Sequence, residues 1–97
     1  MSGMVFHPGH HELHGITVVL ETTGPVTYVG RFDTQDQSGV HLLNVAIHNP
    51  ATSAHSLDEF LARTVKFGVK AERKHLVVPS GEVASIRRLA DPDPSAR

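Results

Sequence analysis

The sequence contains no cysteine, which excludes disulfide bonds, thiol catalysis and zinc sites built on thiolates. It also lacks long hydrophobic runs, since no stretch approaches the roughly 20 apolar residues that a membrane-spanning helix needs. Residues 1–20 lack the basic start and the apolar run of a signal peptide. We therefore expect a cytoplasmic protein that makes no contact with a membrane.

The chain has 97 residues, so it has room for one domain with a modest core. An apolar share of 39% and a charged share of 20% are typical of a folded globular domain rather than a disordered chain. Domains this small often gain further stability by forming oligomers.

Positive charge is concentrated in the second half of the chain. Of the nine Lys and Arg residues, only Arg31 precedes position 63, and residues 63–88 hold seven of them against Glu72 and Glu82. This local excess of positive charge could contact a polyanion. The same residues could equally be solvent-facing positions that the acidic first half balances, and the sequence leaves both interpretations open.

Alternating hydrophobicity predicts five strands. Ile16, Val18 and Leu20, for example, alternate with Thr17 and Glu21, which is the period of a strand with one buried face. The expected strands are residues 16–20, 26–32, 40–48, 65–71 with a continuation at 76–78, and 83–89.

The segment 51–62 between the third and fourth expected strands fits either a short helix or a long loop. Ser56 followed by Glu59 forms a capping-box pattern, and Leu57, Phe60 and Leu61 share one face of a helix drawn over these residues.

Five short antiparallel strands in so short a chain predict an all-β fold, a small, strongly bent five-stranded barrel of the SH3-like kind. Gly30 and Gly68 lie inside expected strands and are the expected bending points.

We expect a polar, His-rich arm over residues 1–12, with at most a short helical turn near residues 10–14. The barrel domain spans 13–89, and the proline-rich tail 90–97 is expected to be disordered.

Two stretches resemble the signatures of the Sm and Sm-like (LSm) protein family. The first resemblance covers about a third of the chain and consists of Leu13, Gly15, Val18, Leu20, Gly24, Tyr28, Gly30, Asp36 and Leu43. The second is the strand, tight turn and strand of residues 76–86. The resemblance implies a homo-oligomeric ring of about five to seven copies, in which the fourth strand of one subunit pairs with the fifth strand of its neighbour.

The resemblance also implies binding of single-stranded RNA at the pore of the ring, with altered base contacts. Val40 stands where RNA-binding members have a base-reading Asn, and Pro79 and Ser80 stand where they have Arg-Gly. The candidate RNA-binding residues that remain are Asp36, Gln37, His41, Ser80 and Gly81. We expect weakened base specificity. The alternative is a structural or adaptor oligomer that binds protein partners without RNA.

Other site chemistry finds little support. His7, His10, His11 and His14 could bind a metal if they lay on one helical face, but Pro8-Gly9 argues against a regular helix and favours a solvated arm. Asp33 and Asp36 fit turn positions, and no nucleophile has an oriented partner in the sequence. We therefore expect no enzymatic activity, no cofactor and no metal.

Overall fold

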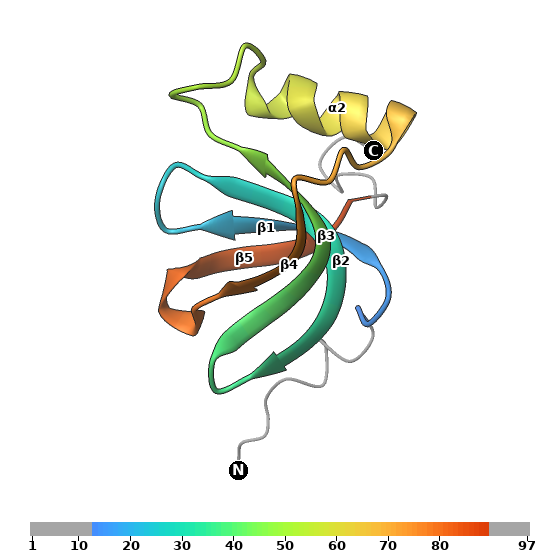
Figure 1. Cartoon of the computed structure of the whole chain (residues 1–97). Coiled ribbons are helices and arrows are strands. Elements are labelled where there is room, and N and C mark those ends of the chain that lie inside the picture. Colours follow the sequence, from blue (N-terminus) through green and yellow to red (C-terminus); the bar gives the residue numbers. More distant parts are fainter. Residues whose placement is uncertain (1–12, 90–97) are drawn as a thin grey trace, which may run out of the picture.

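The computed structural model describes residues 13–89 and shows five strands, one α-helix and one 3-10 turn (Figure 1). In chain order the elements are β1 Thr17–Thr22, β2 Thr27–Asp36, β3 Gly39–His48, α2 Leu57–Phe67, β4 Arg73–Val78, η2 Ser80–Glu82 and β5 Val83–Arg88. The expected helical turn near residues 10–14 falls largely outside the described residues, as do the arm and the tail. No helix in the described part is long and apolar enough to cross a membrane.

The five strands form one antiparallel sheet in the order β4-β3-β2-β1-β5. The sheet is strongly bent, with β2 and β3 curving along their length (Figure 1). The bend is possible where Gly30 meets β3, because a Cβ at Gly30 would lie 3.0 Å from Val45 Cγ2 and 3.1 Å from the Leu43 carbonyl oxygen. The predicted all-β, five-stranded, barrel-like fold is confirmed.

The core lies inside the bend of the sheet. Its fully buried members include Val18, Leu20 and Leu42, with Tyr28 and Ile86 packed against them. A left-handed residue, Asn44 at φ 52°, interrupts β3. Side chains along a strand normally alternate between its two faces, so residues 42 and 45 would face opposite sides. The irregularity at Asn44 shifts this alternation by one residue, and Leu42 and Val45 therefore both face the core.

A second face of the sheet is also buried. Val19, Val29 and Ala46 lie in one row across three strands, and each is at most 2% exposed. Helix α2 lies over this end of the sheet (Figure 1). The His48 ring lies 5.1 Å from the Phe60 ring of α2. The alternation in the sequence predicts one buried face of the sheet, whereas the structure buries residues on both faces.

Segment 51–62 and the fourth strand differ from expectation. A helix does form, and Ser56 caps it by accepting a hydrogen bond from the Glu59 amide at 3.2 Å. It continues to Phe67, so the strand expected over residues 65–71 is wrong, and β4 begins only at Arg73. Gly68 ends the helix at φ 94°, where glycine is favoured, so it is a helix cap and not a strand bend.

Candidate functional site

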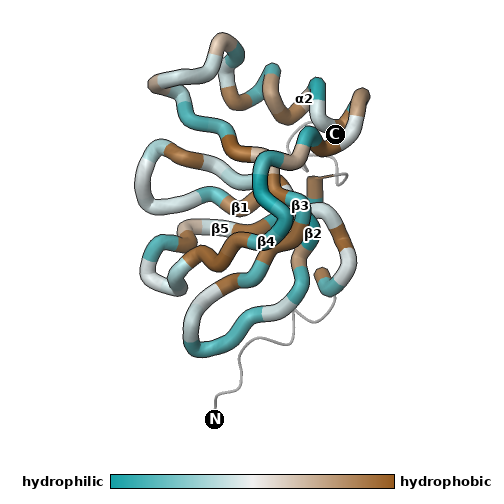
Figure 2. The backbone as a smooth tube through the Cα atoms, viewed as in Figure 1, coloured by the Kyte–Doolittle hydropathy of each residue, from teal (hydrophilic) through white to brown (hydrophobic). Residues whose placement is uncertain are grey.

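The two turns that carry the candidate RNA-binding residues adjoin. Gly39, at φ 136°, opens β3, and a Cβ there would lie 2.0 Å from the Val78 carbonyl oxygen and 2.9 Å from Pro79 Cα. This close approach requires glycine and sets the β2–β3 turn beside the start of the β4–β5 turn. The β2–β3 turn is hydrophilic (Figure 2). Gln37, Ser80 and Gly81 are all exposed.

Asp36 shapes the β2–β3 turn. One carboxylate oxygen accepts a hydrogen bond from the Ser38 amide at 2.8 Å, and the other lies 3.0 Å from Nε2 of His41. Hydrogen bonding to the His41 side chain, followed by the bond from the Ser38 amide, lowers the pKa of Asp36 below its ordinary value. Asp36 is therefore a charged residue at the end of β2 that shapes the turn, whereas Asp33, also expected at a turn, lies inside β2.

His41 continues this contact to a third strand. Its Nδ1 lies 3.1 Å from Nε2 of His75 on β4, with the ring centroids 5.3 Å apart and the planes inclined by 23°. The two rings are nearly parallel, and one ring nitrogen of each lies within hydrogen-bond distance of the other. Asp36, His41 and His75 thus form a series of side-chain contacts across β2, β3 and β4, an ion pair followed by a hydrogen bond.

The sequence did not indicate His75 as a site residue. It comes beside His41 because Leu43 pairs with His75 and His41 with Val77, a register that the misplaced fourth strand concealed. The series holds three ionisable groups but no nucleophile. Among residues 13–89, no group of three or more His, Cys, Asp or Glu is arranged to hold a metal ion.

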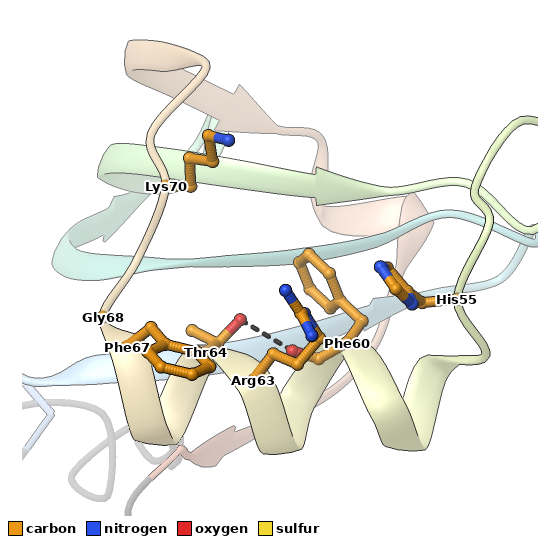
Figure 3. Close-up of a pocket in the computed structure, with 7 residues that line it drawn as sticks. All are labelled: His55, Phe60, Arg63, Thr64, Phe67, Gly68 and Lys70. Atoms are coloured by element: carbon orange, nitrogen blue, oxygen red, sulfur yellow. Dashed lines mark hydrogen bonds between the residues drawn. The ribbon is translucent and has the colours of Figure 1, made fainter.

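A cavity of about 360 Å³ lies beside α2 (Figure 3). Its walls are formed by His55, Phe60, Arg63, Thr64, Phe67, Gly68 and Lys70. Thr64 donates a hydrogen bond to the Phe60 carbonyl at 2.8 Å, which turns its hydroxyl back onto the helix. The sequence analysis missed this cavity, because it assigned residues 65–71 to a strand.

The end of α2 exposes hydrophobic side chains beside cations. Val65 is 60% and Phe67 70% exposed. Arg63 Cζ lies 5.7 Å and Lys66 Nζ 5.4 Å from the centroid of the Phe67 ring, within the range of cation–π attraction.

The outer edges of β4 and β5 form a third surface. Within the described residues, β4 pairs with β3 alone and β5 with β1 alone, so each strand has one edge without a backbone partner. Only Pro79 and the three-residue η2 separate the two strands in sequence, yet they lie at opposite ends of the sheet order.

No protein-family model matches the sequence, and no curated protein matches it. Among solved structures, the chain is similar to a chain in the structure titled "Crystal structure of the NatC complex bound to CoA". The TM-score is 0.51 at 17% sequence identity, and the match covers 89% of this chain and 86% of that one. At this identity the similarity shows a shared fold alone.

Proposed function

We propose that this chain is the subunit of an Sm-like homo-oligomeric ring that serves as a structural or adaptor assembly in the cytoplasm. The observation that carries the proposal is the sheet order, which leaves β4 and β5 each with one unpaired edge. Pairing the β4 of one copy with the β5 of the next would satisfy both edges, and repetition of this contact closes a ring of about five to seven copies.

The short η2 supports this arrangement. Four residues, Pro79 and the three of η2, join the end of β4 to the start of β5, yet the two strands stand at opposite ends of the sheet order. Exposed strand edges bind other strands unless they are protected. The six-residue β4 contains no proline that would block such pairing.

Cross-linking tests the pairing directly, because the native chain has no cysteine. In the full chain, we would introduce Lys74→Cys on β4 and Ser85→Cys on β5, both at exposed positions, and treat the protein with a short bis-maleimide. The double variant should give a ladder of covalent multimers on a denaturing gel. Each single variant should stop at dimers, and a double variant that also stops there would contradict the proposal.

An adaptor role is supported by the chemistry of the two adjoining turns. The Asp36 carboxylate places negative charge on the β2–β3 turn, and Pro79 and Ser80 bring no cation to the β4–β5 turn. Phosphates are unfavourable beside such a surface.

Single-stranded RNA binding is the second candidate, and the contact of Gly39 with Val78 and Pro79 favours it. This contact brings the end of the β2–β3 hairpin, which carries Asp36, Gln37 and His41, near the turn that holds Ser80 and Gly81. Titration of the purified oligomer with oligo-uridine and oligo-adenine RNA tests it. Binding at low salt with little preference between the two is expected, and an absence of binding at low salt would end this candidate.

A further inference from the structure

The cavity beside α2 is a second candidate binding site, on a different surface from the strand edges. It is large enough for one bulky side chain or small ligand, and a pocket of a few hundred Å³ is typical of such sites. Phe60 and Phe67 provide apolar walls, and the position of a Cβ on Gly68 has no atom within 4 Å, so the cavity is open there.

Its charge points to an anionic partner. Arg63 and Lys70 line the cavity (Figure 3). The Lys66 ammonium lies 5.4 Å from the centroid of the Phe67 ring, which also lines it. Among the described residues, no Asp or Glu lines it. Glu59 contacts the lining residue His55 at 3.2 Å, and His55 stands at the other end of the cavity from Lys70 (Figure 3).

The exposed hydrophobic side chains indicate that the partner also supplies apolar surface. Val65 and Phe67 lie on the last turns of α2, more than half exposed. Leu89, the last described residue, contributes with Val65 to an adjacent depression of about 370 Å³. Hydrophobic groups gathered beside cations are typical of surfaces that bind proteins.

A peptide fits this surface better than a nucleic acid does. Single-stranded nucleic acids bind where bases stack on the free faces of aromatic rings. Successive bases need successive rings, whereas Phe60 and Phe67 share one cavity of about 360 Å³. This cavity has room for one inserted apolar side chain and leaves Arg63 and Lys70 for its acidic neighbours.

We propose that the cavity beside α2 binds an acidic segment of a partner protein, which inserts one large apolar side chain between Phe60 and Phe67 while its carboxylates pair with Arg63, Lys66 and Lys70. This interaction uses none of the edge residues of β4 or β5. It therefore goes beyond the proposed ring and holds for a monomer as well as for an oligomer.

The test measures fluorescence polarisation of a labelled peptide of sequence Glu-Asp-Glu-Leu-Phe-Glu-Asp-Glu with the full chain. The wild type should bind it saturably. The double variant Arg63→Glu/Lys70→Glu should lose at least about tenfold in affinity, and Phe67→Ser about fivefold. Both variants change exposed side chains, so their circular dichroism should match the wild type.

Matched controls separate specific binding from charge attraction. The double variant Arg73→Glu/Lys74→Glu, which makes the same change of charge on β4 outside the cavity, should leave the affinity within about twofold. A peptide with Ser in place of Leu-Phe, and one with Gln and Asn in place of its acids, should both bind at least about fivefold more weakly.

Three results would overturn the proposal. The first is equal affinity for the wild type and Arg63→Glu/Lys70→Glu. The second is oligo-uridine binding tighter than the peptide and lost in Phe67→Ser, which would make the partner a nucleic acid. The third is a tenfold gain in peptide affinity for Asp91→Asn/Asp93→Asn, which would show that the acidic end of this chain occupies the cavity.

Discussion

Gly39 is the residue on which the geometry of the two adjoining turns depends. Its φ of 136° lies in a region that favours glycine, and its Cα approaches the Val78 carbonyl too closely for any Cβ. Gly24 also lies in a turn, but a Cβ there would have its nearest neighbour, Thr22 Oγ1, at 3.9 Å. We therefore expect a larger side chain to be tolerated at position 24 and not at position 39.

Gly39→Ala should lower the free energy of unfolding by at least about 2 kcal/mol, because the new methyl group must push Val78 and Pro79 away. Gly24→Ala should change it by less than about 1 kcal/mol. Chemical denaturation of both variants measures the difference. Equal effects at the two positions would show that the close contact at Gly39 is not formed.

The contact between Asp36 and His41 predicts a measurable titration. The folded state holds the Asp36 pKa below its ordinary value, so this carboxylate stabilises the fold above its unfolded pKa and loses that effect as the pH falls through its folded pKa. In His41→Gln, the midpoint of the Asp36 carboxyl carbon signal in NMR should move up towards the ordinary value.

His75→Gln is the matched control for this titration, because His75 contacts His41 and not Asp36. The Asp36 midpoint should stay low in that variant. If both glutamine variants left the midpoint where the wild type has it, the Ser38 amide alone would hold the carboxylate and the role assigned to His41 would be wrong.

At the scale of elements, α2 is the segment that sequence patterns describe least well. Val65, Phe67 and Val69 alternate with Lys66 and other small or polar residues, and this alternation predicts a strand. The exposed fractions of 60% for Val65 and 70% for Phe67 show that burial is not the cause of the pattern. The capping residues predict the ends of the helix better than the alternation does, since Ser56 caps its start and Gly68 its end.

The first three strands and the last could be predicted because their alternation reflects a buried face, as at Val18 and Leu20. The polar contacts of the site were only partly predictable. Asp36 and His41 are five residues apart across one turn, whereas His75 meets them through a strand register that no local pattern encodes.

Ser56→Ala tests the start of α2. Loss of the hydrogen bond to the Glu59 amide should lower the free energy of unfolding by about 1 kcal/mol. Ser80→Ala, at an exposed position of η2, should change it by less than about 0.5 kcal/mol. Thermal or urea unfolding compares the two, and an Ser56→Ala variant as stable as Ser80→Ala would argue against the cap.

At the scale of the molecule, the sheet is bent almost into a barrel but keeps two free edges in the described chain. A small domain buries little apolar surface for its length, so strand pairing between copies would add both hydrogen bonds and buried area. The cavity beside α2 lies on another part of the surface and would remain accessible to a partner in such an assembly.

Native mass spectrometry of the full chain at micromolar concentration tests the central claim of a ring most directly. The account predicts one dominant closed species of about five to seven copies of the 10.5 kDa chain. A mass of a single chain over the whole micromolar range would contradict it, because the edges of β4 and β5 would then have no partner.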